Sequence, residues 1–265
     1  MSCCAQWFPS IDRKGNAFAG WGWNRAAFSN SDIHFRGANY NFTLSDVHAK
    51  DRQTAFNGKT YFGPKTMTIP QTNIRGGFFF GKNWSLTVGV DHMKYVMVQD
   101  QTVSLTGQIG DPQYAEMVHN GQIELTDNFL TFEHTDGLNY LNAELECYQG
   151  IYHSRNFQFN AFAGFGAGAL MPKSNVKLMG YPRNDQFHLA GYGGDLKAGI
   201  ELLFCKIFFL KYEVKGGYIN MPNIVTRAAS EQDRASQHFM FAATDGMFGV
   251  NVTLVKNKAP KIEAK

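Results

Sequence analysis

The sequence predicts an all-β fold, namely an eight-stranded antiparallel up-and-down transmembrane β-barrel with short periplasmic turns and long extracellular loops. Three observations predict it. Apolar and polar residues alternate with a period of two in eight segments. The connections between these segments are short and long in strict alternation. The 265 residues are 14% aromatic and only 18% charged, and no run of about 18 apolar residues offers a transmembrane helix.

Each alternating segment is long enough to cross a membrane as a tilted strand of about 9–11 residues. The segments are Asn16–Phe28, Thr72–Gly81, Trp84–Val98, Leu138–His153, Phe157–Met171, Phe187–Phe204, Phe208–Ile219 and Gln237–Val255. We therefore expect a barrel over 15–255, an N-terminal periplasmic segment over 1–14 and a Lys-rich periplasmic tail over 256–265.

The connections give the barrel its orientation. Three of them are tight turns, at 81–83, 154–156 and 205–207, whereas the other four are long, at 29–71, 99–137, 172–186 and 220–236. Bacterial barrels place tight turns in the periplasm and long loops outside the cell. Alternation continues inside the first two loops, at 33–35, 40–44, 102–105 and 122–125, so we expect strand pairing to continue above the bilayer.

The two faces of the predicted strands differ in charge. The fourth segment places Leu141 and Leu145 on one face, and Glu144 and Glu146 on the other. A lysine or arginine facing mid-bilayer lipid costs roughly 2–4 kcal/mol, so the charged face must line the lumen. The lumen set is Arg75, Asp91, Glu144, Glu146, Asp195, Lys197, Glu201, Lys211, Glu213 and Lys215. An eight-stranded barrel barely holds its own side chains, so these charges are expected to pair and to plug the interior.

Aromatic residues at the strand ends suggest girdles at the two membrane interfaces. Next to the short turns lie Trp84, Phe157, Phe204, Phe208 and Phe209. At the opposite ends lie Trp23, Phe28, Tyr95 and Tyr218.

This pattern resembles the small OmpA/OmpW-like outer-membrane barrels over about residues 15–255. The stretches Ser31–Gly37 and Tyr40–Leu44 also look like segments of uncharacterised outer-membrane barrel proteins. The resemblance implies a bacterial outer-membrane location. One departure is that the last strand runs into a Lys-rich tail instead of ending on an aromatic residue. The start, Met-Ser-Cys-Cys-Ala-Gln-Trp, has no apolar signal core, so we expect an export signal upstream of this chain or already removed.

No standard catalytic, nucleotide or metal motif is present, and we expect no catalytic residue, cofactor or metal. The four cysteines, Cys3, Cys4, Cys147 and Cys205, match no metal spacing and are taken as unpaired thiols. His92 and Lys94 share the face of Val90 and could contact lipopolysaccharide phosphates, unless a bulge turns them inward. The run Glu133–Asp136 could orient a histidine base, but no serine stands beside it in the sequence.

Three functions remain open. The first is an envelope barrel without enzymatic activity that stabilises the outer membrane and displays loops 29–71 and 99–137 to protein or ligand partners. The second, implied by the OmpW-like resemblance, is a narrow conduit for small hydrophobic molecules. The third is a lipid A-modifying enzyme. Outer-membrane lipid and lipopolysaccharide are the expected partners. Nucleic acid is not expected, because the net charge is only +3 and the basic tail is a solvated end.

Overall fold

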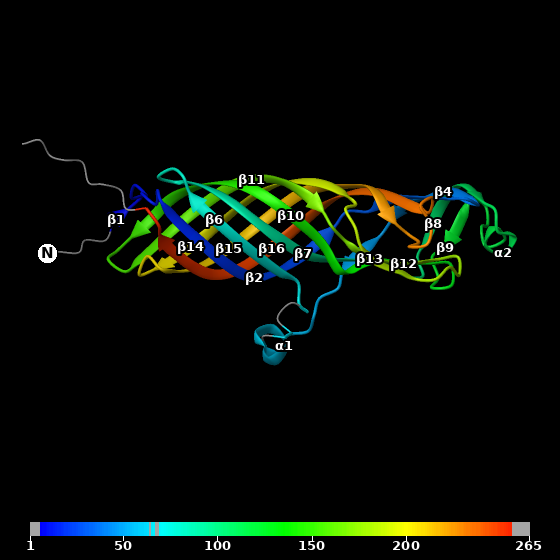
Figure 1. The fold of residues 1–265 in the computed structure, drawn as a ribbon, viewed down its shortest axis with the longest axis horizontal. Coiled ribbons are helices and arrows are strands. Elements are labelled where there is room, and N and C mark those ends of the chain that lie inside the picture. Colours follow the sequence, from blue (N-terminus) through cyan, green and yellow to red (C-terminus); the bar gives the residue numbers. More distant parts are fainter. Residues whose placement is uncertain (1–5, 64, 67–68, 256–265) are drawn as a thin grey trace, which may run out of the picture.

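The computed structural model describes residues 6–63, 65–66 and 69–255, and it is an elongated β-structure (Figure 1). A barrel occupies one end, together with the first and last described residues, Gln6 and Val255. A narrower β-structure, which we call the extension, continues from the other end. The predicted tail at 256–265 lies outside the described residues, as do Cys3 and Cys4. Cys147 and Cys205 are free thiols.

Eight antiparallel strands close into a ring, which confirms the predicted fold class. Their spatial order is β2, β6, β7, β10, β11, β14, β15 and β16, and pairing of β16 with β2 closes the circle. The strands are β2 Asn16–Phe28, β6 Thr72–Phe79, β7 Trp84–Met97, β10 Leu130–His153, β11 Phe157–Leu170, β14 Gly191–Phe204, β15 Phe208–Val225 and β16 Arg234–Thr253.

The ring strands differ from the predicted segments mainly at their extracellular ends. β10, β15 and β16 begin earlier or end later than predicted, because they continue beyond the membrane into the extension. Phe187, which was assigned to the sixth barrel strand, instead ends the separate strand β13. Alternation alone does not mark where a strand leaves the ring, because the period of two continues through the boundary.

The extension is built by the long loops, as the alternation inside two of them predicted. It contains β3 Ser31–Gly37, β4 Tyr40–Val47, β8 Thr102–Ile109, β9 Gln122–Glu124, β12 Lys173–Leu178 and β13 Asn184–Phe187. β3 pairs with the upper part of β16, and β12 pairs with the upper part of β10. The extension therefore grows directly out of the barrel wall.

Four short elements complete the chain. β1 Gln6–Trp7 pairs with the end of β10, and β5 Ala49–Asp51 pairs with the end of β7. The helix α2 Pro112–Ala115 lies at the tip of the extension, whereas α1 Gly58–Phe62 projects sideways from the barrel (Figure 1). No helix among the described residues has the length and apolar character needed to cross a membrane.

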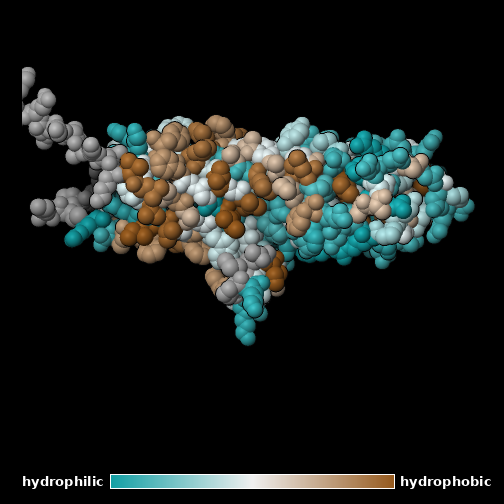
Figure 2. Space-filling model, in the orientation of Figure 1, coloured by the Kyte–Doolittle hydropathy of each residue, from teal (hydrophilic) through white to brown (hydrophobic). Residues whose placement is uncertain are grey.

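An apolar belt covers the outside of the barrel. On β15 the outward residues Leu210, Tyr212 and Val214 are each 51–53% exposed, although they are large and apolar or aromatic. From Phe208 to Tyr218 such a face runs about 34 Å along the strand, or about 24 Å across a bilayer at a tilt of about 45°. That height matches the apolar band of outer-membrane barrels, about 25 Å. Figure 2 shows apolar side chains gathered on the barrel wall and hydrophilic ones on the extension.

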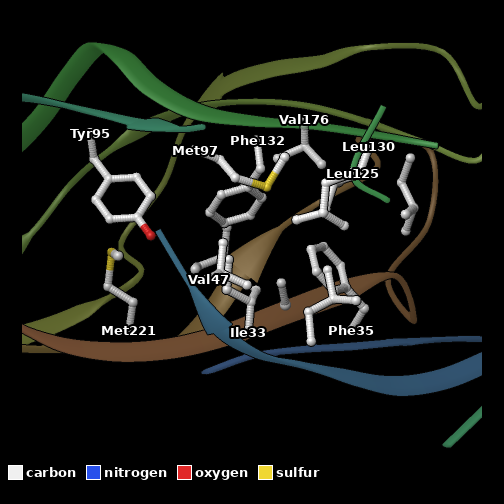
Figure 3. Packing of buried hydrophobic residues seen from close by; sticks show 14 of the residues in the cluster. Ile33, Phe35, Val47, Tyr95, Met97, Leu125, Leu130, Phe132, Val176 and Met221 are labelled. Atoms are coloured by element: carbon white, nitrogen blue, oxygen red, sulfur yellow. The ribbon is translucent and has the colours of Figure 1, made fainter. Parts of the chain in front are cut away.

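The interior of the extension is a hydrophobic core. Ile33, Phe35, Phe132 and Val176 are buried there and come from the three strands β3, β10 and β12 (Figure 3). Phe35 packs edge-on against Phe132, with ring centroids 5.8 Å apart. The extension is thus a folded unit with its own core rather than a set of open loops.

Three predicted girdle residues point inward instead of outward. Phe209 and Tyr95 are almost fully buried, and the ring of Phe28 packs against Tyr95 inside the extension. The reason is strand parity: Tyr95 shares the face of Asp91, and Phe209 follows the outward-facing Phe208. Adjacent residues of a strand cannot both face lipid. Trp84 and Phe208 do face outward, as expected.

Candidate functional site: the charged interior of the barrel

The ten charged residues assigned to the lumen are all buried inside the ring. None is more than 6% exposed. They come from β6, β7 and β10, which are consecutive in the ring, and from β14 and β15, which β11 separates from β10. They are Arg75, Asp91, Glu144, Glu146, Asp195, Lys197, Glu201, Lys211, Glu213 and Lys215. The structure brings most of them into one connected network of ion pairs.

Lys197 is the centre of this network. Its ammonium lies 2.6 Å from a carboxylate oxygen of Glu144, 2.5 Å from Glu146 and 3.4 Å from Glu213. All four side chains are almost completely buried. A buried ammonium with three carboxylate neighbours satisfies its three N–H donors without water.

Lys215 and Arg75 form the upper part of the network, towards the extension. The Lys215 ammonium lies 2.8 Å from Asp91 and 2.5 Å from Glu144. Arg75 pairs with the same Asp91 and lies 3.4 Å from Glu144. Above them the Tyr140 hydroxyl donates to Asp195 at 2.8 Å. Asp91 is shared by Arg75 and Lys215, and Glu144 by these two and Lys197, which ties β6, β7, β10, β14 and β15 together.

Lys211 forms the lower part, towards the periplasm. Its ammonium lies 3.5 Å from Glu146 and donates to the hydroxyl of Tyr148, which itself donates to Glu146 at 2.6 Å. Aromatic faces surround it, with the Phe18 centroid 4.5 Å away and the Phe162 centroid 5.0 Å away. Cation–π contacts replace hydration for a lysine in such an aromatic layer.

Arg13 completes the network from a place that the sequence reasoning missed. The N-terminal segment was assigned to the periplasm, yet Arg13 is only 4% exposed and enters the lower mouth of the barrel. It lies 2.5 Å from Glu201 and 4.0 Å from the centroid of the Phe79 ring. The sequence did contain a signal for a further buried base. The predicted lumen set has six acids and only four bases, so at least one more cation was needed to pair the acids.

Asp245 is a second residue that the prediction omitted. It lies on β16 directly across from Glu213 on β15, and it is 2% exposed. Neither of its carboxylate oxygens has a hydrogen-bond partner among the described residues. Its inward position follows from the parity of β16, where Phe239, Phe241 and Asp245 share one face. With Arg13 and Asp245 the interior holds seven acids and five bases.

His92 and Lys94 lie outside this network, near the outer rim. Nδ1 of His92 lies 2.9 Å from the Oδ1 atom of Asn139. Lys94 is 8% exposed, because its ammonium donates to the carbonyl of Ile69 at 2.7 Å. A lipopolysaccharide phosphate would reach Lys94 only if the segment around Ile69 moved aside, so this lysine holds a loop to the wall. The phosphate contact of His92 stays a prediction.

The run Glu133–Asp136 lies in the extension, above the membrane. Nδ1 of His134 is 2.9 Å from Oγ of Ser174, a serine that the sequence could not place. Both side chains are fully buried, and Nε2 of His134 has no hydrogen-bond partner among the described residues. Burial lowers the pKa of His134 to about 3. A nucleophilic site needs an acid to orient the histidine and an opening for the substrate, and this pair has neither.

The acids beside His134 are engaged elsewhere. Glu133 accepts from Arg52 at 2.7 Å and from Asn175 at 2.6 Å. Asp136 pairs with Lys173 at 2.8 Å, and this hydrogen bond lowers the pKa of Asp136. Within the described part of the chain, no three His, Cys, Asp or Glu residues converge as a metal site.

No protein-family model matches the chain, and no curated protein matches it. Several solved structures resemble it over nearly their whole length. OprG of Pseudomonas aeruginosa is 9% identical, with 92% of this chain and 98% of OprG covered and a TM-score of 0.42. AlkL is 8% identical, with 95% and 96% covered and a TM-score of 0.41. Ail, the attachment invasion locus protein of Yersinia pestis, is 7% identical, with 90% and 99% covered and a TM-score of 0.32.

These similarities concern the fold alone, because the identities are below 10%. The assignment therefore rests on the geometry of this chain: a closed ring of eight antiparallel strands, an apolar belt outside and a charged interior. Only a closed barrel satisfies every backbone group of a β-structure inside lipid. This chain is a small transmembrane β-barrel of the outer-membrane type, similar to the OmpA/OmpW-like barrels.

Proposed function

We propose that this protein is an envelope barrel with a closed interior, which stabilises the outer membrane and displays its extension to partners outside the cell. The observation that carries the proposal is the sequence of layers inside the molecule. The layers follow one another along the interior, from the periplasmic mouth to the core of the extension.

The lowest layer is aromatic. Phe18, Phe79, Phe162 and Phe209 are buried there as one cluster, and Arg13 stacks on Phe79. The ion-pair network follows, and the hydrophobic core of the extension closes the upper end. Three consecutive layers of such packing oppose the continuous column of water that a conducting pore needs, and this supports a closed interior.

The extension supports the display part of the proposal. Its strands pair with each other and with the barrel, so the surface that they carry is held in one geometry. A hollow of about 710 Å³ opens near the tip, and Asn39, Tyr40, Gln108 and Val118 are among the residues that line it. Binding residues usually lie on loops that a rigid scaffold positions. The 29–71 and 99–137 loops together provide this hollow.

Planar-bilayer recording tests the closed interior. Purified protein that shows heat-modifiable migration should give no steady current. A steady current would overturn the proposal and would favour the narrow conduit.

Protease treatment of intact cells tests the display. Cleavage should occur within 29–71 or 99–137, while the barrel fragment stays in the membrane. Resistance in intact cells, with cleavage only after lysis, would place the extension in the periplasm and would contradict the display. Mass spectrometry of lipid A, with and without expression, tests the enzymatic alternative, and unchanged acylation is expected.

A further inference from the structure

A short arm leaves the barrel rim and folds back against the outer wall. We call residues 52–63, 65–66 and 69–71 the α1 arm. It contains the helix α1, which Asn57 caps by accepting from the backbone N–H of Lys59 at 2.9 Å. In Figure 1 the helix stands off the side of the barrel, away from the axis along which the extension continues. The arm therefore takes no part in the core of the extension.

The arm is attached to the lipid-facing side of the wall. The ring of Phe62 meets the ring of Trp23 edge-on at 5.3 Å, and Tyr61 lies 5.6 Å from the same Trp23. Trp23 in turn lies in an outward aromatic cluster with Trp21 and Phe248. Phe248 is 40% exposed and belongs to the apolar belt. The apolar surface of the belt thus continues without a break onto the arm.

Polar contacts fix the height of the arm. Arg25 lies two residues above Trp23 on β2, and its guanidinium donates to the hydroxyl of Tyr61 at 2.9 Å. That hydroxyl donates to the carbonyl of Thr54 at 2.7 Å, and Lys94 holds the carbonyl of Ile69. An arginine on the outer face costs little only near the interface and roughly 2–4 kcal/mol at mid-bilayer. The arm therefore lies at the outer edge of the hydrocarbon.

The free side of the arm is amphipathic. Phe56, Phe62 and Ile69 are 76%, 59% and 50% exposed, which leaves three large apolar side chains largely uncovered. Lys59 and Lys65 are exposed beside them. Apolar side chains with neighbouring lysines, at the height of a tryptophan, are typical of a segment that lies in a membrane interface.

We infer that the α1 arm is a membrane-interface anchor. Phe56, Phe62 and Ile69 enter the outer leaflet beside the barrel, and Lys59 and Lys65 contact the phosphates of its lipids. The occupant is the lipid of the surrounding membrane, because the arm continues the lipid-facing belt and carries positive charge towards an anionic headgroup layer. The inference needs only the barrel in a bilayer, and it is independent of what the extension binds.

Site-directed fluorescence in proteoliposomes tests the anchor. In a background in which the four cysteines are replaced by serine, Phe62→Cys is labelled with a polarity-sensitive nitrobenzoxadiazole fluorophore. Leu210→Cys on the belt is the control for lipid, and Gln108→Cys on the extension is the control for water. Heat-modifiable migration verifies that each labelled protein is folded.

The label at residue 62 should behave like the one at residue 210. We expect blue-shifted emission and quenching by nitroxide lipids several-fold stronger than at residue 108, with little quenching by aqueous iodide. Iodide quenching equal to that at residue 108 would overturn the inference. Shielding from both quenchers would also overturn it, because a protein surface would then cover the arm.

The lysines have a separate test. Adding anionic phosphatidylglycerol to phosphatidylcholine vesicles should increase the nitroxide quenching at residue 62. The increase should vanish in the Lys59→Gln/Lys65→Gln variant, whereas Lys177→Gln, an exposed lysine of the extension, should retain it. An equal increase in all three proteins would contradict a phosphate contact of these two lysines.

Discussion

The barrel and the extension share strands but have opposite interiors. On β15 the inward residues Lys211, Glu213 and Lys215 belong to the ion-pair network. Further along the same face, Ile219 and Met221 belong to the hydrophobic core of the extension. The strand parity does not change between these positions. One continuous face therefore switches from charged to apolar between Lys215 and Ile219.

The difference shows that the surroundings, and not the strand, decide what an interior contains. Around the barrel the outside is hydrocarbon, so apolar residues must face outward and the inside can hold charges that pair. Around the extension the outside is water, so the strands need an apolar interior to be stable. We therefore expect the outer boundary of the membrane to lie at this switch on β15.

The largest effect is expected from breaking the barrel network at its centre. Lys197→Met should destabilise the folded barrel by about 3–5 kcal/mol, because Glu144, Glu146 and Glu213 would lose their shared ammonium while they stay buried. Denaturant unfolding in detergent micelles measures the change. Lys177→Met, at an exposed position of β12, is the control and should change stability by less than about 0.5 kcal/mol. Equal midpoints for both variants would mean that water solvates the lumen charges.

A cavity in the extension should have a local effect of slightly smaller size. Phe132→Ala should cost about 3–4 kcal/mol, because the ring is 1% exposed and packs against Phe35 and Tyr95. Limited proteolysis should then cut the extension while the barrel keeps its heat-modifiable migration. Phe187→Ala, at a 58% exposed position of β13, should leave the cleavage pattern unchanged. Loss of barrel migration in Phe132→Ala would show that the two regions unfold as one unit.

The extension should also lose stability in acid, through His134. Burial lowers the pKa of His134 to about 3, below the ordinary value of 6.5. Above pH 6.5 the histidine is neutral in both states and the full stability is present. As the pH falls towards 3 only the unfolded state takes up the proton, which costs about 1.4 kcal/mol per pH unit, or about 2 kcal/mol at pH 5.

Hydrogen exchange of the extension between pH 7 and 5, corrected for intrinsic rates, measures this loss. His134→Gln should remove most of the dependence. Burial also lowers the pKa of His188, so a smaller dependence of the same sign should remain. A pH dependence unchanged by His134→Gln would refute the assignment.

The smallest effect is expected from relieving a repulsion in the lumen. Asp245→Asn should stabilise the barrel by about 1 kcal/mol, because the carboxylate has no partner among the described residues and faces Glu213 across the ladder. Glu201→Gln is the matched control and should destabilise it, because Glu201 is paired with Arg13 at 2.5 Å. If Asp245→Asn were destabilising, the carboxylate would have a partner such as a bound water or cation.

Much of the barrel could be predicted from the sequence because lipid imposes a strict pattern. The period of two and the cost of outward charges together placed Glu144, Lys197 and Lys211 in the lumen. Arg13 could not be predicted in this way, because it lies before the first barrel strand, in a segment without alternation. Asp245 could have been predicted, because the parity of β16 assigns it to the inner face.

The extension was predicted only in part. Alternation at 33–35 and 40–44 indicated strands above the bilayer, and β3 and β4 confirm them. It did not indicate that their inward residues would form a hydrophobic core, because the lumen was expected to be polar throughout. The contact of Ser174 with His134 joins residues 40 positions apart. Such a contact depends on the pairing of β12 with β10, which no local pattern reports.

The position of the membrane boundary on β15 is the most direct test of this account. Nitroxide labels at Tyr212, Val214 and Asn220, introduced one at a time in the cysteine-free background, share the outward face across that boundary. Power saturation in bilayers should show high oxygen and low nickel-chelate accessibility at residues 212 and 214, and the reverse at residue 220. Nickel accessibility at residue 212 or 214 equal to that at residue 220 would contradict it, because the outside of the barrel would then face water.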